Sequence, residues 1–277
     1  MNRIRSQDGF TLVEALVALA ISGIVASALI SLMLGQTRFY QHTDDQIWAE
    51  QSNRAAFDLL SSELRMASAI DLLVAKPDSV SMRFDIMRAI VCDSVAADQA
   101  TLMVYDTVAA WGLDGGFTGT AYSGPYEEAF EFADAFLPST AATGSGPKAT
   151  CVANGAPSTS PSNTYATLSG WGGNFTGGVP DRGSIVRFYS RLTYRFAPST
   201  FFASRTALWR GAQELVGPFE NGAAFSYVMD DGTLRNNVPP SQLDEVVSVR
   251  VTATAVGDGA NRYGVQRQMQ FDVPFRN

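Results

Sequence analysis

The chain has 277 residues, with 20 Lys and Arg against 27 Asp and Glu, so its formal net charge is −7. An apolar fraction of 46% with 17% charged residues excludes a disordered chain and indicates a packed core, in one large domain or two small ones. The acidic balance argues against a nucleic-acid partner, and one His with two Cys disfavours the commonest hydrolase and zinc-enzyme sites.

The first element in chain order is a long apolar segment, residues 10–34, in which Glu14 is the one charged residue. As a helix it would span about 37 Å, enough to cross a hydrocarbon core of about 30 Å. Arg3 and Arg5 ahead of it favour a cytoplasmic N-terminus with the remainder of the chain outside. The segment is too long for the apolar region of a secretory signal peptide. An intramembrane carboxylate costs about 2–3 kcal/mol, so Glu14 needs a cation, either on another chain or at a new amino terminus made by cutting nearby.

The residues Gly9-Phe10-Thr11-Leu12-Val13-Glu14, after a short basic leader and before an apolar helix, resemble the type IV prepilin signal. The resemblance implies that a membrane-embedded prepilin peptidase removes the leader, residues 1–9, by cutting between Gly9 and Phe10. It further implies that Phe10 is then N-methylated, and that Glu14 pairs with the terminal amine of a neighbouring subunit during assembly.

The same resemblance implies that the apolar side chains along the helix bury against adjacent helices in a filament, among them Leu12, Leu16 and Leu19. Two positions depart from the usual pattern. Asp8 stands where a basic or neutral residue is more usual, and Ser31 stands where major pilins often carry a helix-breaking Pro. The second departure argues against melting of the helix at its middle, although Gly23 and Gly35 are weak points.

Residues 35–76 contain no Pro and continue the helical pattern as an amphipathic helix. The positions Phe57, Leu60, Leu64 and Ala67 recur at three- and four-residue spacing, which predicts one apolar stripe packed against a sheet. We therefore expect one helix from Phe10 to about Ile70. The stretch QSNRAAFDLLSSELRMAS also resembles the PilW-like minor pilins, and the J-class minor pseudopilins of type II secretion have a similar size and build.

Beyond residue 77 the apolar period changes to two, which predicts β-strands. The candidates are Ser79–Phe84, Thr101–Asp106, Val186–Phe196, Ala224–Met229, Val247–Ala255 and Met269–Val273. In the third of these, which is either a half-buried strand or a bent pair, Arg187, Arg191 and Arg195 face away from the apolar side. Asp258-Gly259 predicts an antiparallel pair from the last two candidates, and Asp230-Asp231-Gly232 predicts another hairpin.

The predicted fold is therefore α+β and pilin-like, with a long N-terminal helix packed on an antiparallel sheet. Residues 77–277 would form a β-rich globular domain in the periplasm. Between about 107 and 183 the composition shifts to Gly, Ser, Thr, Ala and Pro, which predicts a large loop-rich insertion. Its aromatic residues are interpreted as buried anchors, with an exposed recognition surface as the alternative: Trp111, Phe117, Trp171 and Phe175.

Cys92 and Cys151 would both lie in the oxidising periplasm, so we expect them to form a disulfide; two separate buried thiols are the alternative. Acidic turns at Asp114-Gly115, Asp230-Asp231-Gly232 and Asp258-Gly259 could offer oxygens to Ca²⁺, but none has the spacing of a calcium-binding loop, so solvated turns are favoured.

Four carboxylates predict an acidic helical patch over a small apolar cluster: Glu127, Glu128, Glu131 and Asp134, set among Tyr126, Phe130, Phe132 and Phe136. The sequence contains no nucleotide-binding or serine-hydrolase motif. We expect no catalytic site, no metal and no cofactor.

The sequence thus favours a minor pilin, a structural subunit that primes or caps assembly of a type IV pilus. The expected partners are other pilins, the prepilin peptidase and methylase, and an inner-membrane assembly platform, with no sequence-specific nucleic acid. The expected location is the bacterial inner membrane, as a single-pass protein, and then the pilus. Two alternatives stay open, a minor pseudopilin of type II secretion and a membrane-anchored or pilus-tip adhesin that binds a ligand through the loop region.

Overall fold

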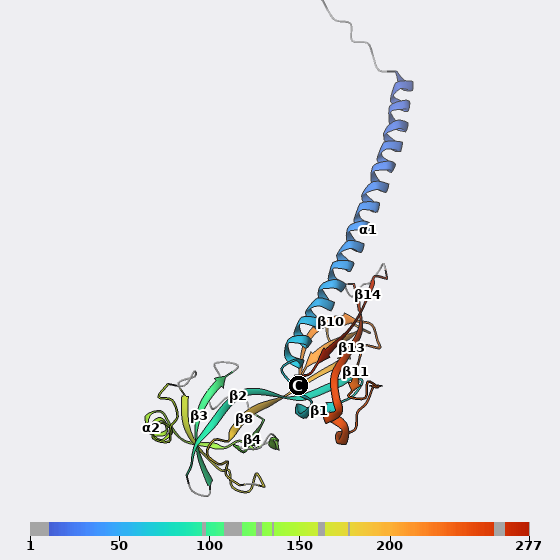
Figure 1. Cartoon of the computed structure of the whole chain (residues 1–277). Coiled ribbons are helices and arrows are strands. Elements are labelled where there is room, and N and C mark those ends of the chain that lie inside the picture. The colour runs from blue at the N-terminus through green and yellow to red at the C-terminus, as the bar shows by residue number, and fades with distance from the viewer. Residues whose placement is uncertain are drawn as a thin grey trace, which may run out of the picture.

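A long helix and a large antiparallel sheet make up the computed structural model, which describes residues 11–95, 98–107, 118–125, 129–134, 136–159, 164–176, 178–257 and 264–276. Helix α1 covers Leu12–Leu64, 53 residues, and is about 80 Å long at 1.5 Å per residue. Its first half projects away from the rest of the molecule, and its second half lies along the sheet (Figure 1).

Helix α1 ends at Leu64, before the expected end near Ile70 and before the predicted boundary at residue 76. The chain then forms a short 3-10 turn, η1 (Ala69–Asp71), and strand β1 (Leu72–Ala75). The reason is local. The carboxylate of Asp71 accepts hydrogen bonds from the backbone N–H and the hydroxyl of Ser68, at 3.1 and 2.8 Å, and this side-chain cap starts a new turn.

The buried face of α1 changes from small to large residues along the chain. After Asp45 the buried positions are Ala49, Ser52 and Ala56, and the hydroxyl of Ser52 donates to the carbonyl of Gly217 at 3.1 Å, so the helix lies close to the sheet there. Further along, Leu60 and Leu64 fill the core, as the apolar stripe predicted. Of the other two positions in that stripe, Ala67 is buried in the core. Phe57 lies at the rim, where its ring packs edge-on against that of Phe271 with ring centroids 4.8 Å apart.

The strands of the described residues join in a 14-stranded antiparallel sheet. After β1 they are β2 (Ser79–Val95), β3 (Gln99–Thr107), β4 (Gly119–Ser123), β5 (Glu131–Asp134), β6 (Ser139–Thr143), β7 (Thr164–Ser169), β8 (Ile185–Pro198), β9 (Thr206–Arg210), β10 (Gln213–Phe219), β11 (Ala224–Met229), β12 (Leu234–Arg235), β13 (Val246–Val256) and β14 (Gln266–Pro274). The main order is β12-β11-β13-β10-β9-β8-β2-β3-β7-β6, with β1, β14, β4 and β5 branching from it. Helix α2 (Ser145–Ala153) and the 3-10 helix η3 (Pro240–Glu245) lie between strands.

Two long strands, β2 and β8, divide the sheet into two lobes, which are separated in Figure 1. They pair with each other from Ser79↔Arg195 to Ile90↔Ile185. At one end β1 and β9 flank them, in the near lobe, which also holds β10 to β14 and the second half of α1. At the other end β3 and β4 flank them, in the distal lobe, which also holds β5 to β7 and α2. We call the paired stretch between the lobes the neck.

Each lobe has its own hydrophobic core. The near-lobe core joins the end of α1 to the inner faces of the sheet and includes Leu60, Tyr194 and Phe225. The distal-lobe core is built around Leu102, Trp171 and Phe188. The molecule therefore has two packed bodies on one continuous ribbon of strands.

The region 107–183 is more regular than its composition predicts. It contains β4, β5, β6, α2 and β7, and it supplies much of the distal lobe. The acidic stretch is also corrected: Glu131 and Asp134 lie in strand β5, which pairs with β4, and not in a helix. Glu127, Glu128 and Tyr126 lie outside the described residues. The prediction missed these strands because each is only four to six residues long and none has a long alternating pattern.

The two predicted C-terminal hairpins are present. β13 and β14 pair from Ser248↔Pro274 to Val256↔Gln266, and β11 pairs with β12 through the turn at residues 230–233. The period of two in the predicted strand Val247–Ala255 places Val247 on the same face as Val249 and Val251, but Val247 is 40% exposed and Val246 is buried instead. A register shift between Val228 and Met229 of β11 explains the difference, because it places Val246 opposite Met229.

Candidate functional site

The N-terminal end of α1 carries the residues that the sequence singles out for function. Thr11 is the N-cap of the helix, and its hydroxyl accepts a hydrogen bond from the backbone N–H of Glu14 at 3.2 Å. In return, Oε2 of Glu14 accepts from the backbone N–H and the hydroxyl of Thr11, both at 3.1 Å. This reciprocal capping box satisfies backbone donors that the first turn of a helix otherwise leaves unpaired.

Glu14 therefore has a role within its own chain that sequence reasoning missed. The signal was present, because Thr and Glu three residues apart before an apolar run is the pattern of a capping box. The capping box uses Oε2 alone, and no donor among the described residues reaches Oε1. The capping box thus holds the helix start through one carboxylate oxygen of Glu14. Gly9 and Phe10, the predicted cleavage and methylation positions, lie outside the described residues.

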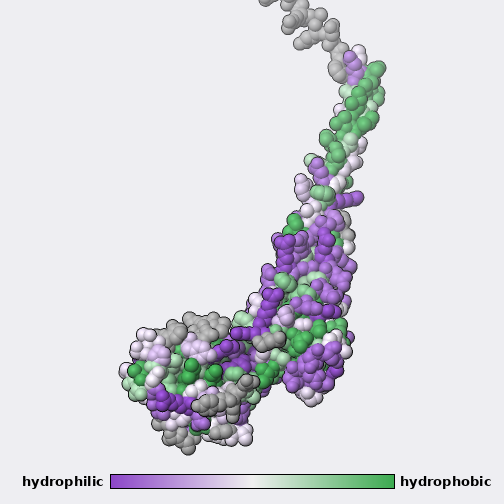
Figure 2. Space-filling model, in the orientation of Figure 1, coloured by the Kyte–Doolittle hydropathy of each residue, from purple (hydrophilic) through white to green (hydrophobic). Residues whose placement is uncertain are grey.

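The first half of α1 is an apolar rod with no protein packed on it. Leu12, Leu16 and Leu19 are 79%, 63% and 76% exposed, and every residue from 11 to 41 is exposed. Figure 2 shows this stretch in green, beyond the mostly purple near lobe. Within the part of the chain that the structure describes, α1 is the one helix long and apolar enough to cross a membrane. Such a surface needs either lipid or other apolar helices around it.

A charged network holds the neck between the two lobes. The guanidinium of Arg187 on β8 is buried, and it donates to Asp85 on β2 and to Asp71 in η1 with N–O distances of 2.7–2.9 Å. Asp85 also accepts from Arg88 at 2.7 Å. Burial lowers the pKa of Arg187, but the hydrogen bonds and charges of Asp85 and Asp71 outweigh it and raise that pKa above its ordinary value.

This burial corrects the prediction that Arg187 faces outward with Arg191 and Arg195, both of which are exposed. No sequence pattern indicates this network, since Arg187 and Asp71 are 116 residues apart. The distal lobe covers this part of β8, and the ring of Phe130 lies 4.8 Å from the Arg187 guanidinium carbon.

A second ion pair joins β5 to the neck. Arg83 on β2 donates to both carboxylate oxygens of Asp134, at 3.0 and 3.1 Å, and the hydroxyl of Tyr189 on β8 donates to the same carboxylate at 2.7 Å. The hydrogen bonds from Arg83 lower the pKa of Asp134 by more than burial raises it. Burial raises the pKa of Tyr189, and its bond to Asp134 adds to the shift. The other described carboxylate of the predicted patch, Glu131, accepts from the hydroxyl of Thr176 at 2.7 Å.

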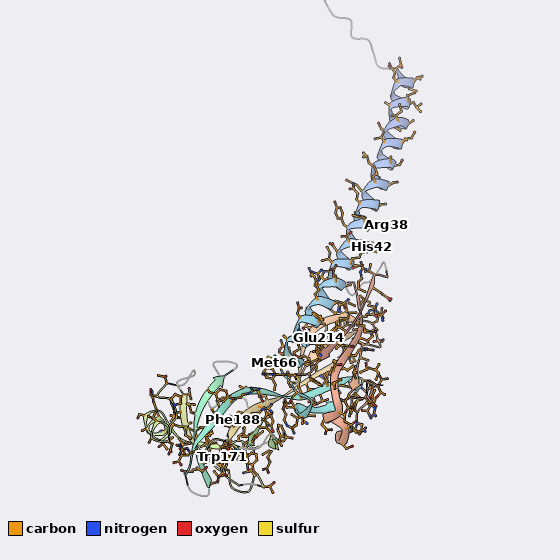
Figure 3. All side chains as sticks on the ribbon, in the orientation of Figure 1. Arg38, His42, Met66, Trp171, Phe188 and Glu214 are labelled. Atoms are coloured by element: carbon orange, nitrogen blue, oxygen red, sulfur yellow. A yellow bond between two sulfur atoms is a disulfide. The ribbon has the colours of Figure 1, made fainter. Side chains whose placement is uncertain are left out.

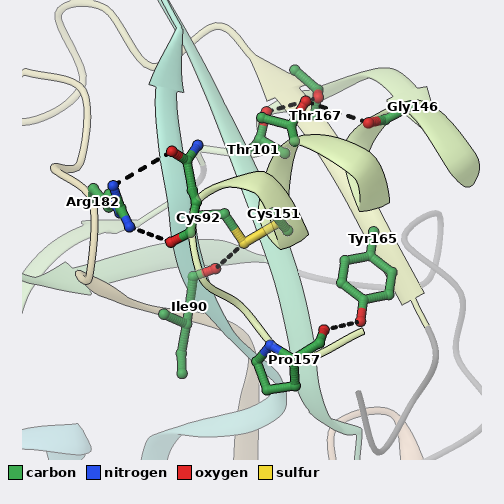
Figure 4. Close-up of a disulfide and its surroundings, with 11 residues drawn as sticks. Ile90, Cys92, Thr101, Gly146, Cys151, Pro157, Tyr165, Thr167 and Arg182 are labelled. Atoms are coloured by element: carbon green, nitrogen blue, oxygen red, sulfur yellow. Dashed lines mark hydrogen bonds between the residues drawn. A yellow bond between two sulfur atoms is a disulfide. The ribbon is translucent and has the colours of Figure 1, made fainter. Parts of the chain in front are cut away.

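Cys92 on β2 and Cys151 on α2 form a disulfide in the structure, with their Cα atoms 4.9 Å apart (Figure 4). It fastens the helix of the distal lobe to the strand that leads back to the near lobe. Beside it, Arg182 donates to the backbone carbonyl of Asn154, and the hydroxyl of Tyr165 donates to the carbonyl of Pro157 at 3.0 Å. Trp171 and Phe175 are buried, as expected for anchors, whereas Trp111 and Phe117 lie outside the described residues.

The acidic turn that the structure describes is closed by its own hydrogen bonds. Asp231 accepts from the backbone N–H and the hydroxyl of Thr233, at 2.8 and 2.6 Å. The turns at Asp114-Gly115 and Asp258-Gly259 fall outside the described ranges. Across the described residues no group of three or more His, Cys, Asp or Glu side chains is placed to hold a metal ion.

Comparison with known protein families gives a match at the N-terminus. The family described as the prokaryotic N-terminal methylation motif matches residues 4–30, which include the capping box and the first half of the apolar rod. No curated protein and no solved structure matches the chain.

Proposed function

We propose that this chain, a type IV prepilin-like protein by its methylation motif and its long apolar helix, is a minor pilin that primes or caps the assembly of a type IV pilus. The motif implies processing by a prepilin peptidase and assembly with other pilins. The further steps of the proposal are a cut between Gly9 and Phe10, N-methylation of Phe10, and extraction of α1 from the membrane into the filament.

The observation that carries the proposal is that the two halves of α1 differ in exposure and packing. Its first half is apolar and exposed, while its second half is fixed to the sheet through Ser52, Leu60 and Leu64. The globular part of the chain therefore leaves the rod available, in the membrane before assembly and among other helices afterwards. Glu14 is exposed at the tip of the rod, where a neighbour's terminal amine would meet its carboxylate in a medium that screens charge weakly.

The proposed topology places the globular lobes in the periplasm. Arg3 and Arg5 precede the apolar segment and favour a cytoplasmic N-terminus. The disulfide between Cys92 and Cys151 fits an oxidising compartment on the other side.

The shape of the molecule favours a minor subunit over a major one. The distal lobe extends sideways from the line of α1 (Figure 1). A subunit repeated along a shaft must fit the same neighbours on every side, and a lateral lobe obstructs that repeat. One copy at a filament tip meets no such obstacle.

The test is intact-mass and N-terminal analysis of the chain from its native host, in the membrane fraction and the sheared-pilus fraction separately. We expect an N-methylated Phe10 terminus in the pilus fraction, at a small fraction of the abundance of the major subunit. A Gly9→Leu variant is the control, and we expect it to remain an uncut precursor in the membrane. A mature chain found with a secretion complex and absent from pili would assign it to a pseudopilus instead. An uncut Met1 terminus in the wild type would refute both assignments.

A second candidate function is display of a binding module, and the separate core of the distal lobe favours it. A lobe that has its own core and a disulfide can carry a recognition surface without disturbing the helix. The test compares adhesion to host or abiotic surfaces by cells with the wild-type chain and by cells lacking it, at matched piliation. Loss of adhesion with normal pilus numbers would support display of a binding module. Unchanged adhesion would indicate that the distal lobe makes contacts with other subunits instead.

A further inference from the structure

A cleft lies on the neck, where the end of α1, the C-terminal segment and strand β2 meet. One hollow of about 200 Å³ is lined by Arg65, Met66, Phe84, Asp85, Ile86, Met87, Arg88 and Arg276. An adjoining hollow of about 260 Å³ shares three of these residues, Met66, Arg88 and Arg276. Figure 3 places Met66 where the helix reaches the neck, and Figure 2 shows hydrophilic residues, in purple, gathered over the neck on this face. We call the two hollows together the neck cleft.

The charges of the neck cleft do not cancel. Asp71 and Asp85 are both engaged by the buried Arg187, and Arg88 shares Asp85. Arg65 and Arg276 also line the cleft, and no carboxylate among the described residues lies within ion-pair distance of either. Among the described side chains that line the cleft, four guanidinium groups thus face two carboxylates, an excess of two positive charges in a chain whose formal net charge is −7.

The two unpaired arginines start from fixed positions on the backbone. Arg65 is the C-cap of α1, in helical geometry, and its backbone N–H donates to the last turn. The backbone N–H of Arg276 donates to the carbonyl of Ala67 at 3.0 Å, which ties the C-terminal segment to the end of the helix. Both side chains are exposed, so their guanidinium donors are available to a ligand.

The walls between these charges are apolar. Met66 is 48% exposed at the point shared by both hollows, and Phe84, Phe130 and Ile185 line the cleft on either side of it. A ligand that fits both hollows needs acidic groups for the arginines and an apolar group for Met66. Guanidinium groups bind carboxylates in a two-pronged geometry, and a flexible thioether adapts to varied apolar side chains. A nucleic acid does not fit, because its affinity needs an extended basic surface and the rest of the chain is acidic.

We propose that the neck cleft is a docking site for an acidic peptide segment of a partner protein, with carboxylates on Arg65 and Arg276 and an apolar side chain against Met66. The charge complementarity commits the site to this occupant. The site does not depend on leader cleavage or filament assembly, and a partner bound there contacts both lobes and the helix end at once.

The experiment measures peptide binding to the purified full chain in detergent by fluorescence anisotropy. The probe is a fluorescein-labelled hexapeptide of alternating glutamate and leucine, and its matched control has glutamine in place of each glutamate. We expect saturable binding of the acidic probe, weakening as salt is raised, and at least tenfold weaker binding of the glutamine peptide. Equal affinity for the two peptides would overturn the proposal.

Two variants locate the site. The double variant Arg65→Gln/Arg276→Gln should weaken binding of the acidic probe about tenfold, because it removes both unpaired guanidinium groups. Arg54→Gln, on the same helix at a side chain that is 75% exposed and outside the cleft, should leave binding unchanged. All three positions are exposed, and circular dichroism with a thermal melt checks that each variant folds. Equal losses from the double variant and from Arg54→Gln would refute the site. Displacement of the probe by inorganic phosphate at matched ionic strength would also refute it, by showing a small-anion site.

Discussion

At the scale of single residues, Glu14 combines two roles that its position makes compatible. As the third residue of α1 it closes the capping box with Thr11, and as a charge at the tip of an apolar rod it is the group that the proposed assembly uses. The first role needs a hydrogen-bond acceptor, which Gln also supplies, and the second needs a negative charge. Substitutions can therefore separate the two.

We predict that Glu14→Gln keeps the start of the helix and loses incorporation into the filament, while Glu14→Ala loses both. Loss of an N-terminal capping interaction costs about 1 kcal/mol, so the alanine variant should fray at its first turn. The measurements are the chain's abundance in sheared pili and amide exchange at residues 12–15 in detergent. Normal incorporation of Glu14→Gln would show that assembly does not need the negative charge of Glu14.

Arg187 is the residue on which the neck depends most directly. It is buried with two carboxylates around it, so removing it leaves Asp71 without its ion-pair partner and leaves Asp85 with Arg88 alone. Breaking a buried ion pair from one side costs about 3–5 kcal/mol, much more than an exposed charge contributes.

We predict that Arg187→Met lowers the free energy of unfolding by about 3–5 kcal/mol, and that Arg191→Met, at the exposed position on the same strand, changes it by less than about 0.5 kcal/mol. Urea unfolding followed by near-ultraviolet circular dichroism measures both. Equal stability of the two variants would show that the neck is held by the pairing of β2 with β8 alone.

At the scale of elements, the sequence predicts those helices and strands whose apolar residues recur at a regular spacing over many residues. The apolar rod and the stripe through Leu60 and Leu64 follow from helical periodicity, and the hairpin of β13 and β14 follows from alternation around a turn. The end of α1 was placed too late because the cap that stops it, Ser68 with Asp71, is a local hydrogen-bonding choice within a stretch that still reads as helical.

The functional residues also fall into those that the sequence predicts and those that only the fold brings together. The prepilin signal is contiguous, so sequence alone places Glu14 and its neighbours. The neck network is assembled from η1, β2 and β8, and the neck cleft adds the end of α1 and the C-terminal segment. Arg65 and Arg276 are distant in sequence and meet only because the sheet returns to the end of the helix. The short strands β4 and β5 were missed because their partners, and not their own patterns, make them strands.

The disulfide between Cys92 and Cys151 links two elements of the distal lobe, β2 and α2. It closes a loop between residues 92 and 151, a separation of 59, for which the loop-entropy model gives about 4 kcal/mol. Because it joins β2 to α2, we predict that Cys92→Ser/Cys151→Ser destabilises the distal lobe by about that amount and leaves the near lobe intact. Limited proteolysis should cut within residues 144–159 much faster, while α1 and β13 keep their protection from amide exchange. Uniform loss of protection across both lobes would show that the two cores unfold as one.

At the scale of the whole molecule, two cores sit on one ribbon, and the contacts at the neck set how the lobes lie. These contacts differ in kind. The Arg187 network is buried, whereas Asp134 is 58% exposed and bridges β5 to β2 and β8 from the surface. The bridge through Asp134 should respond to a change of pH, because the pKa of Asp134 is lowered in the folded chain.

For Asp134 the direction follows from its lowered pKa. A carboxyl group whose pKa is lower in the folded state contributes stability above its unfolded pKa, about 3.9, and loses that contribution as the pH falls through the folded value. The Asp134 side chain is 58% exposed, so the contribution of its pair with Arg83 at neutral pH is under about 1 kcal/mol. We predict that Asp134→Asn is less stable than the wild type at pH 7, and that the difference in the free energy of unfolding shrinks as the pH falls from about 4 to 2. Thermal unfolding of both chains across that range measures the difference, and a gap that persists at pH 2 would mean that the substitution acts through packing at Tyr189 and not through the ion pair. The tie from β5 to the neck would then be steric, and only the buried Arg187 network would hold the lobes by charge.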